Sequence, residues 1–359
     1  MTVTTDAPLA PLTTLGIGGP ARRLVTAGTD DDLVACLREL DDAPEERTLL
    51  LAGGSNVVLP DEGFDGTVVR IATRGVRLEL AGEAGESGES GVLVHAAAGE
   101  PWDDLVARTV EEGLAGFECL SGIPGSTGAT PVQNVGAYGQ EVGDTLVAVD
   151  AYDRDRGERC RLTAAECGLG YRRSRFKHSE RVVVLGVTFR LRRSAAACPV
   201  RYLELANRLG VEVGEPAGLA EVRAAVLDLR RGKAMVVDPA DPDSRSAGSF
   251  FTNPVLDRAG YDALAALAGS PVPHFASAGE AGTEAIKVPA AWLIERAGFG
   301  RGYGSGAVGI STKHSLALVN RGGGTARELL ALARTIRDGV RDRFGVELRP
   351  EPVIVGATL

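Results

Sequence analysis

No stretch of this 359-residue sequence approaches the roughly 18 consecutive apolar residues that a membrane-spanning helix needs. The first residues, MTVTTDAPLAPLTTLG, also lack the basic stretch followed by an apolar stretch that is typical of a secretion signal. We therefore expect a cytoplasmic protein without membrane insertion. Hydrophobic residues make up 44% of the chain, enough to bury several cores and to exclude disorder as the main state. At roughly 150 residues per domain, this length predicts two or three domains.

Cysteine is scarce and scattered. The cysteines show no CxxC spacing, and the four histidines form no metal-ligand pattern, so neither a disulfide framework nor a metal site is supported. We expect reduced thiols at Cys36, Cys119, Cys160, Cys167 and Cys198. The net charge of -9 gives a field that repels DNA and anionic lipid, which disfavours a nucleic-acid or membrane-surface partner.

Two common signatures, GxxxxGK[ST] for phosphate binding and HExxH for zinc, are missing from the sequence. A GxGxxG does occur at Gly304, Gly306 and Gly309, but a dinucleotide-binding fold needs a strand before it and a helix after it. The strand-like segment SLALVN follows instead. We therefore disfavour a dinucleotide role for these glycines.

Short β-branched segments separated by turn residues dominate the first half of the chain, and longer helices dominate after about Tyr202. Thr29 is expected to cap one helix, and Pro101 is expected to open another. Near the end, apolar residues at a spacing of three or four predict an amphipathic helix: Ala326, Leu329, Leu330, Ala333, Ile336, Val340 and Phe344. The fold class is therefore α+β. Residues 81–90, AGEAGESGES, offer nothing to bury and are expected to form a dispensable exposed hairpin tip.

Two glycine-rich segments are more informative. Gly53-Gly54-Ser55-Asn56 interrupts an apolar run, as expected for a strand, a tight turn and a second strand, and its backbone N–H groups could turn inward to bind an anion. The segment 116–143 has neither helical nor strand periodicity, and a long loop of this kind is usually functional. Both segments can also be interpreted as ordinary tight turns, and the residues alone leave this open.

Three further features could carry chemistry. The run from Tyr171 to His178 concentrates four cations, although such a run is ordinarily a solvated face. Ser249 stands beside a glycine, two aromatic residues and a proline, which could simply be a turn that enters a strand. Glu351 stands between two prolines in an apolar terminal strand, either at an edge or held there for a function.

Seven motifs carry a resemblance when they are taken in chain order: TTLGIGGPA, LAGGSNVVLP, SGIPGSTGATPVQNVGAYG, YRRSRFK, GSFFTNP, AAWLIERAG and LRPEPVIVG. Together they resemble the UDP-N-acetylenolpyruvoylglucosamine reductases of bacterial cell-wall synthesis, from about Thr13 to Gly356. The resemblance implies an α+β protein with a two-lobed FAD-binding domain of the vanillyl-alcohol-oxidase type and a C-terminal α+β substrate domain.

The resemblance also suggests boundaries for these parts. Lobe 1 is expected at residues 1–60, joined by the C-terminal tail 345–359. Lobe 2 is expected at 61–205, and the substrate-binding domain at 206–344.

The activity implied by the resemblance is that of an NADPH-dependent flavoenzyme. It would reduce UDP-N-acetylglucosamine enolpyruvate to UDP-N-acetylmuramate, a peptidoglycan precursor, with this substrate and NADPH as partners and a monomer as the expected state. FAD is expected to bind non-covalently, because GGSNVV offers no His or Cys for a covalent link. The implied FAD-binding residues lie in the two glycine-rich segments: Gly53, Gly54, Ser55, Asn56, Val57, Ser121, Gly122, Pro124, Gly125, Ser126, Gly128, Ala129, Gln133, Asn134, Gly136 and Ala137.

The resemblance further assigns catalytic roles. Hydride addition at C3 drives negative charge onto C2 and the carboxylate of the enolpyruvyl group, so Arg172 and a protonated Glu351 would clamp that carboxylate. Ser249 would be the general acid that protonates C2. RYLELANRL resembles the substrate-capping loop of the longer family type, with Tyr202 as the capping tyrosine. Further implied substrate contacts are Lys233, Asn253 and Glu295.

Two other functions stay open at this point. Another FAD-dependent oxidoreductase on the same scaffold would oxidise an alcohol or a sugar with oxygen as acceptor, and would turn over without an enolpyruvyl substrate. A non-catalytic UDP-sugar binding protein would keep the pocket but not the chemistry. The simultaneous presence of Arg172, Ser249 and Glu351 argues against this last alternative.

Overall fold

The computed structural model describes residues 1–81, 91–278 and 284–359. These divide into two compact units: unit 1 is 1–7, 21–54 and 64–232, and unit 2 is 8–20, 55–63 and 233–359. After Ala81, the expected hairpin tip lies outside the described residues. The division into two flavin lobes and a substrate domain concerns ligands and stays a prediction.

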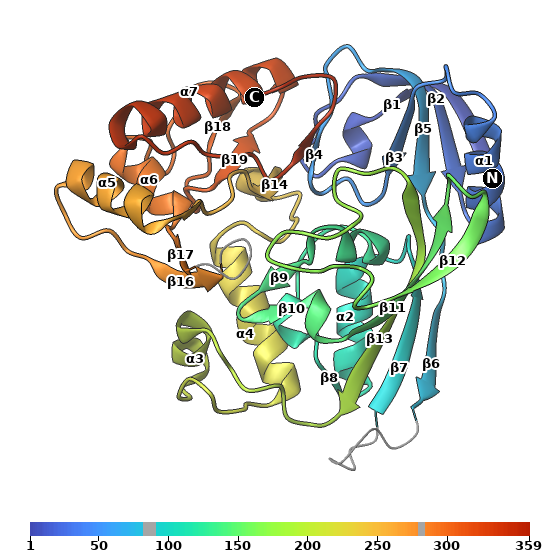
Figure 1. Cartoon of the computed structure of the whole chain (residues 1–359), viewed down its shortest axis with the longest axis horizontal. Helices are drawn as coiled ribbons and strands as arrows, with labels where there is room; N and C mark the ends of the chain where they lie inside the picture. Colours follow the sequence, from blue (N-terminus) through green and yellow to red (C-terminus); the bar gives the residue numbers. More distant parts are fainter. Residues whose placement is uncertain (82–90, 279–283) are drawn as a thin grey trace. The chain divides into compact units, whose positions relative to one another are not determined.

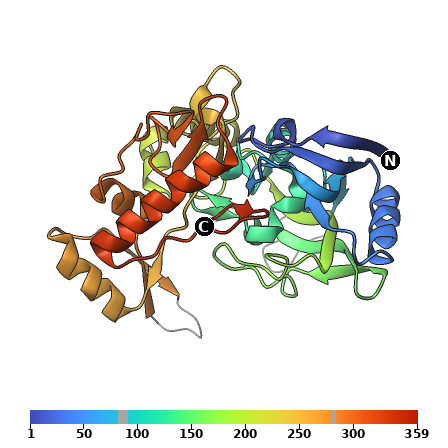
Figure 2. The ribbon, with the colours of Figure 1, turned by 90° about the horizontal axis from the view of Figure 1, so that it is seen from above.

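Unit 1 contains a small sheet in the order β1-β2-β5-β3, in which β2 and β3 run parallel to β5 (Figure 1). Its strands are β1 (Thr2–Pro8), β2 (Pro20–Ala27), β3 (Thr48–Leu51) and β5 (Phe64–Ile71). Helix α1 (Asp30–Asp41) follows β2 and lies beside these strands (Figure 2). The Thr29 hydroxyl accepts the Asp32 N–H at 3.1 Å, which confirms the expected helix cap.

A larger antiparallel sheet follows in unit 1, in the order β12-β11-β13-β7-β6. Its strands are β6 (Val76–Leu80), β7 (Gly91–Ala97), β11 (Leu146–Asp153), β12 (Glu158–Thr163) and β13 (Val182–Arg193), and β8 (Leu114–Ala115) also pairs with β13. Helix α2 (Trp102–Glu111) begins after Pro101, as expected. Its first residue, Trp102, packs on Phe117 and Phe189 with ring centroids 4.9 and 6.0 Å away, and all three side chains are fully buried.

Two further helices, α3 (Leu203–Leu209) and α4 (Leu219–Gly232), also pack within unit 1. Leu205 of α3 and Val222 of α4 share a buried cluster with Cys119. Cys119 directly precedes Leu120 at the start of the second glycine-rich segment. Helix α4, which the sequence-based scheme places in the substrate-binding domain, therefore packs against the start of the second glycine-rich segment.

The described residues of unit 2 form three small sheets and three helices. Its strands are β4 (Val57–Val58), β14 (Ser246–Ser249), β15 (Val255–Leu256), β16 (Phe275–Ala278), β17 (Glu284–Lys287), β18 (Val308–Ile310), β19 (Ala317–Asn320) and β20 (Val353–Ile354). They pair as β14-β19-β18, β15-β17-β16 and β20-β4. The helices are α5 (Arg258–Ala268), α6 (Ala290–Arg296) and α7 (Ala326–Phe344), and short 3-10 turns lie at η1 (Ala10–Leu12) and η7 (Pro242–Ser244).

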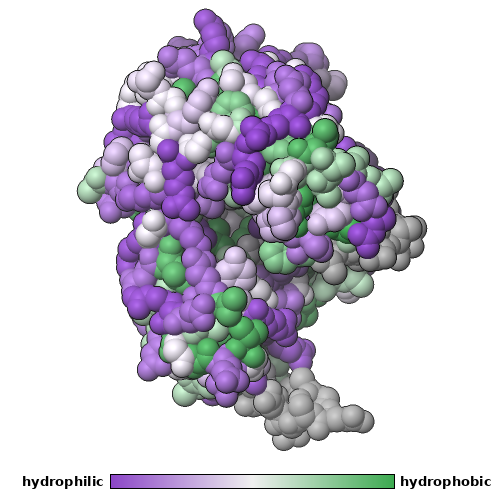
Figure 3. Space-filling view, turned by 90° about the vertical axis from the view of Figure 1, so that its left-hand side faces the viewer, coloured by the Kyte–Doolittle hydropathy of each residue, from purple (hydrophilic) through white to green (hydrophobic). Residues whose placement is uncertain are grey.

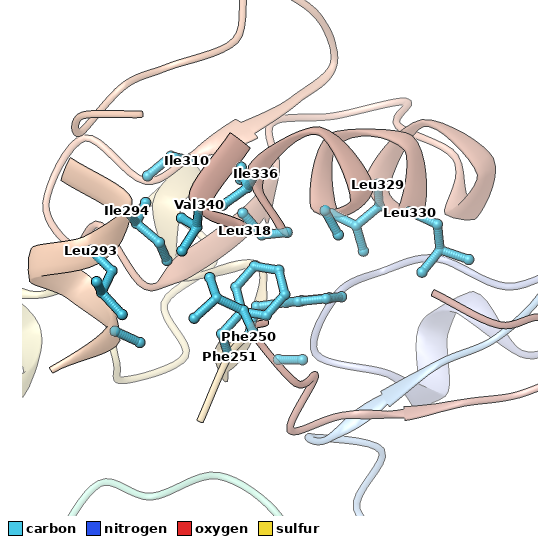
Figure 4. Packing of buried hydrophobic residues seen from close by; sticks show 14 of the residues in the cluster. Phe250, Phe251, Leu293, Ile294, Ile310, Leu318, Leu329, Leu330, Ile336 and Val340 are labelled. Atoms are coloured by element: carbon cyan, nitrogen blue, oxygen red, sulfur yellow. The ribbon is translucent and has the colours of Figure 1, made fainter. Parts of the chain in front are cut away.

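Helix α7 confirms the predicted amphipathic stripe, because all seven of its apolar positions are buried. Thr325 and Glu328 form a capping box at its start, and Gly345 ends it with a φ of 68°. The buried side chains of α7 lie over Phe250 and Phe251 in the core of unit 2 (Figure 4). The two phenylalanines therefore fix the segment that carries Ser249.

The structure confirms that a strand, and not a helix, follows the GxGxxG segment. Gly309 lies within strand β18, and β19 follows after a short turn, so no helix begins at these glycines. At the surface, hydrophilic and hydrophobic residues are interspersed over the face drawn in Figure 3. Among the described residues, no helix combines the length and apolar character that crossing a membrane would need.

Candidate active site

The first glycine-rich segment is a tight turn between β3 and β4 whose backbone touches the second segment. A Cβ built on Gly53 would lie 2.5 Å from the Cα of Gly125, far inside van der Waals contact, so only glycine fits. Gly54 has a φ of 62°, in the left-handed region that favours glycine. Within the described residues, the N–H of the buried Gly54 has no hydrogen-bond partner.

The second segment folds into short turns and a small hairpin. They are η3 (Glu118–Leu120), η4 (Thr127–Ala129), η5 (Pro131–Gln133), β9 (Gly136–Ala137), β10 (Gln140–Glu141) and η6 (Val142–Asp144). Gly128 packs so closely on Ala98 that a Cβ there would lie 2.4 Å from the Ala98 Cβ. Ser126 is only 4% exposed, and its hydroxyl finds no hydrogen-bond partner in the part of the chain that the structure describes.

These two turns fit the diphosphate of a flavin cofactor. Buried donors are nearly always paired in folded proteins, so the Gly54 N–H and the Ser126 hydroxyl indicate a ligand. Amide and hydroxyl donors suit phosphate oxygens, and bare glycine backbone allows a ligand to approach closely. We therefore favour a ligand-binding role over ordinary tight turns.

Other predicted cofactor residues hold the loops together. Asn134, in the left-handed conformation, donates from Nδ2 to Glu141 at 2.7 Å and accepts the Gly143 N–H at 2.9 Å. The Ser121 hydroxyl donates to the Glu118 carbonyl at 2.7 Å. The remaining predicted residues are buried or half-buried in the same turns: Ser55, Val57, Gly122, Pro124, Ala129, Gln133, Gly136 and Ala137.

Arg172 reaches the second glycine-rich segment. Its backbone is left-handed, with a φ of 51°, and its guanidinium donates to the carbonyls of Asn134 and Gly136 at 3.4 and 3.3 Å. Arg172 is half-buried, whereas Arg173 and Arg175 are exposed. The cation run is therefore a solvated face at Arg173 and Arg175 only, because Arg172 turns toward the loop.

Backbone pairing in unit 2 brings Ser249 and Glu351 onto neighbouring segments. Ser249 ends β14 opposite Ala317 of β19. The carbonyl of the next residue, Phe250, accepts the Glu351 N–H at 2.9 Å. One backbone hydrogen bond therefore connects the residue after the predicted general acid to the predicted carboxylate clamp.

Glu351 precedes the terminal strand instead of lying inside it, which corrects the sequence-based expectation. Strand β20 begins only at Val353, because Pro352 has no N–H to contribute to a ladder. The Val353 N–H donates to the Asn56 carbonyl at 3.0 Å, and Asn56 Nδ2 donates to the Glu351 carbonyl at 3.4 Å. The end of the first glycine turn is thus connected to Glu351 within unit 2.

Tyr202 stands at the start of α3 with 47% of its surface exposed. Its ring meets Tyr138 of the second glycine-rich segment edge to face, with centroids 5.5 Å apart. Burial, as the largest cause, raises the pKa of Tyr138 to about 12, so this phenol stays neutral near pH 7. The predicted capping tyrosine is therefore in contact with the predicted flavin loop.

The other predicted substrate contacts are spread over unit 2. Lys233 is half-buried at its start, directly after α4. Asn253 Oδ1 accepts the Ala290 N–H at 2.9 Å and so caps α6, which leaves the Asn253 amide group as its donor for a ligand. Glu295 lies exposed on α6, and within the described chain its side chain makes no hydrogen bond to another predicted site residue.

Sequence reasoning missed two carboxylates that hold the second segment in place. Glu118 is fully buried, and Asp103 accepts the Gly122 N–H at 2.6 Å. Arg223 of α4 grips Asp103 with two hydrogen bonds of 2.7 and 3.0 Å. The one available signal was the position of Glu118 among apolar residues in FECL, whereas Asp103 looks like any acid in a first helical turn.

The cysteines are free thiols in the structure. Burial raises the pKa of Cys167 and of Cys198 to about 11, so both are protonated near pH 7. Among the described residues, no three His, Cys, Asp or Glu side chains are grouped so that they could hold a metal ion.

The fold and the two glycine turns define an FAD-binding protein of the α+β class. A model of the FAD binding domain family matches residues 21–163, and a model described as "UDP-N-acetylenolpyruvoylglucosamine reductase, C-terminal domain" matches residues 239–355. This confirms the predicted fold class and FAD as the cofactor, and the chain is an oxidoreductase.

Proteins similar over almost the whole chain share one description. The UDP-N-acetylenolpyruvoylglucosamine reductase of Salinispora arenicola is 56% identical, across 98% of this chain and 95% of that protein. The protein of the same description from Streptomyces coelicolor is 53% identical, across 99% and 90%. A crystal structure of UDP-N-acetylenolpyruvylglucosamine reductase from Thermus caldophilus shares the fold, with a TM-score of 0.61, 24% identity and 98% coverage of both chains. The chain belongs to the UDP-N-acetylenolpyruvoylglucosamine reductase family.

Proposed function

We propose that this protein reduces UDP-N-acetylglucosamine enolpyruvate to UDP-N-acetylmuramate, with FAD as cofactor and NADPH as reductant. Membership of the family over nearly the full chain supports this reaction. The structural observation that carries the proposal is the hydrogen bond between the Phe250 carbonyl and the Glu351 N–H. It sets a hydroxyl, at Ser249, and a carboxyl group on adjacent segments of the matched C-terminal domain.

FAD, when bound, supplies a hydride acceptor for NADPH and a hydride donor for the substrate. The two touching glycine turns would hold it through the Gly54 N–H and the Ser126 hydroxyl, which lack partners within the described residues. Binding is non-covalent, because the GGSNVV turn contains neither His nor Cys. In this assignment residues 1–60, joined by the tail 345–359, form the first FAD-binding lobe, and residues 61–205 form the second.

The reaction requires a group that withdraws charge from the substrate. The ether oxygen of the enolpyruvyl group enriches C3 in electrons, so C3 is a poor hydride acceptor unless the carboxylate is polarised. Arg172 would bind this carboxylate through its guanidinium, and Glu351 would donate a hydrogen bond to it when protonated. Contacts of Arg172 with the carbonyls of the flavin loop support its role, because they orient the guanidinium.

Ser249 would then donate a proton to C2. A hydroxyl is a weak acid, but the enolate-like species formed after hydride addition is a strong base, so the two are matched. The position of Ser249 supports this role, because the two residues that follow it, Phe250 and Phe251, are buried in the core of unit 2 and fix the end of its strand. In the described part of the chain the Ser249 hydroxyl makes no hydrogen bond, which leaves its proton available.

Four further residues would hold the UDP-sugar. Tyr202 would cap the substrate, and Lys233 and the Asn253 amide would contact its diphosphate and neighbouring groups. Glu295 would contribute a further contact from the substrate-binding domain, assigned to residues 206–344. Local cations such as Lys233 then explain how a chain with a net charge of -9 binds polyanions.

The same proposal covers the cellular setting. NADPH and nucleotide sugars are cytoplasmic metabolites, and the five free thiols suit a reducing compartment, so the protein works in the cytoplasm. It acts as a monomer and needs no nucleic-acid partner, in keeping with its acidic charge.

One experiment tests the function directly. The purified protein should show a flavin absorption spectrum, and NADPH should bleach it without oxygen. Added UDP-N-acetylglucosamine enolpyruvate should restore the oxidised spectrum and yield UDP-N-acetylmuramate. Rapid reoxidation by oxygen with an alcohol or a sugar as reductant would favour the oxidase alternative, and tight UDP-sugar binding without any flavin reoxidation would favour the non-catalytic one.

A further inference from the structure

Glu118 is a buried carboxylate for which the proposed chemistry has no use. It lies in η3 with none of its surface exposed. Its Oε2 accepts the Gly116 N–H at 2.6 Å, and its Oε1 accepts the Cys198 N–H at 2.7 Å and the Gln140 side-chain amide at 2.9 Å. Three segments that are separate in sequence thus meet at one side chain.

The arrangement needs a carboxylate in particular. Both oxygens of an ionised glutamate accept hydrogen bonds. Glutamine has a single acceptor oxygen, and its NH2 group would face one of the three N–H groups, so that two donors would meet. A donor left unpaired at a fully buried site is costly, because water cannot replace the lost partner. Gln140 is itself held in place, since its Oε1 accepts the Cys119 N–H at 2.9 Å.

Two of the three contacts, those with Gln140 and Cys198, link the end of the flavin loop to the start of the capping segment. Gln140 ends the turn that carries Tyr138, and Cys198 lies four residues before Tyr202. Two more contacts join the same segments. Tyr138 and Tyr202 meet edge to face, and a Cβ on Gly139 would lie 2.8 Å from the Arg201 Cβ.

We propose that Glu118 is a positioning residue that fixes the capping Tyr202 against the flavin loop. The inference rests on the proposed function, in which Tyr202 closes over the UDP-sugar. Glu118 touches neither substrate nor cofactor in this assignment. It holds the Cys198 backbone in register with Gln140, and the position of Tyr202 follows from that register.

The test replaces Glu118 with its closest uncharged analogue and follows the two half-reactions separately. Glu118→Gln should retain FAD and be reduced at saturating NADPH within about twofold of the normal rate. Its KM for UDP-N-acetylglucosamine enolpyruvate should rise about 5-fold to 30-fold, the range expected when one buried hydrogen bond is lost and a donor is left unpaired. In a Tyr202→Ala background the same exchange should change KM less than about twofold, because the residue through which it acts is gone.

A control separates positioning from general destabilisation. Thr29→Ala removes the N-cap of α1, which destabilises unit 1 without touching either segment, and should leave KM unchanged. If Glu118→Gln does not retain FAD, Gln140→Met carries the test, since it keeps the carboxylate and removes one of its three donors. That variant also removes the acceptor of the Cys119 N–H, and it should raise KM in the same direction.

Two results would overturn the positioning role. One is a KM of Glu118→Gln, or of Gln140→Met where that variant carries the test, that equals the KM of Thr29→Ala. The other is a rise in KM of the same size with and without Tyr202. Failure of the proposed function looks different. In that case the unaltered protein itself would not turn over the enolpyruvyl substrate, whatever residue stands at position 118.

Discussion

Replacing Ser249 with alanine isolates a single proton transfer. In the described part of the chain, the Ser249 hydroxyl makes no hydrogen bond, and the pairing of β14 with β19 uses backbone groups alone. Removing the hydroxyl should therefore change stability by no more than about 0.5 kcal/mol. FAD binding and flavin reduction by NADPH need no proton at C2, so both should be nearly normal.

Turnover with the enolpyruvyl substrate should behave differently. Loss of general acid catalysis costs about 10²-fold to 10⁴-fold in rate. Loss of an ordinary hydrogen bond to substrate costs about 0.5 to 1.5 kcal/mol, or roughly 2-fold to 13-fold. These ranges do not overlap, so the size of the effect identifies the role. Ser249→Cys should recover part of the rate, because a thiol can still donate a proton.

Anaerobic stopped-flow absorbance follows flavin reduction by NADPH and reoxidation by the enolpyruvyl substrate as separate traces. Ser246→Ala is the matched control, since it makes the same chemical change earlier in the same strand. Ser246 accepts the Gly248 N–H at 3.2 Å, so this control should lose about 1 kcal/mol of stability with little change in either rate. If Ser249→Ala slows reoxidation by less than about tenfold, another group delivers the proton and the general-acid assignment is refuted.

Three further changes test other parts of the site. Arg172→Ala should slow reoxidation by about 10²-fold to 10³-fold while flavin reduction stays near normal, and equal slowing of both steps would assign Arg172 to the flavin or to NADPH. Gly53→Ala should cost about 1 to 3 kcal/mol and lower the FAD content of the purified protein, because its Cβ would meet backbone 2.5 Å away, whereas Gly306→Ala meets nothing within 4 Å and should retain FAD. Asp103→Asn should lower the melting temperature at pH 7. Desolvation alone would raise the pKa of Asp103, but hydrogen bonds from Arg223 and the flavin loop outweigh it and hold this pKa below its usual value. The stabilisation is therefore present above the unfolded pKa of about 3.9 and lost as pH falls through the folded value, so wild type and variant should converge once the pH is below the folded pKa. A melting difference that persists there would mean that Asp103 acts by packing.

The fold was predictable where local patterns coincide with tertiary packing. Helix α7 is the plainest case, because the stripe read from the sequence is the buried stripe of the structure. Strand β12 gave no such signal, since ERCRLT alternates exposed charges with a single buried leucine. The order of strands around β13 also could not be predicted, because partners such as β7 and β8 lie far away in sequence and each has several β-branched alternatives.

The candidate site divides along the same line. Glycine turns have a local signature, since glycine itself permits the conformations that they need, and so Gly53 and Gly54 stood out in the sequence. The groups that hold these turns do not. Glu118 and Asp103 are ordinary acids until the chain is folded, and only then do N–H groups from distant segments converge on them.

Arg172 shows how one backbone torsion decides between a surface charge and a functional one. The run YRRSRFKH contains three arginines that the sequence cannot rank, because all three carry the same charge within four positions. Of the three arginines, only Arg172 has a positive φ in the structure. Non-glycine residues adopt such a φ at a cost of about 1 to 3 kcal/mol and keep it only where their surroundings fix them. The Arg172 guanidinium donates to two carbonyls of the flavin loop, and the Lys177 ammonium donates to the Arg172 carbonyl at 3.0 Å. These contacts offset the strain and turn the charge inward, whereas Arg173 and Arg175 remain in solvent. A substitution that relieves the strain, Arg172→Gly, should therefore lose the activity as fully as Arg172→Ala, because the function lies in the guanidinium that the torsion directs.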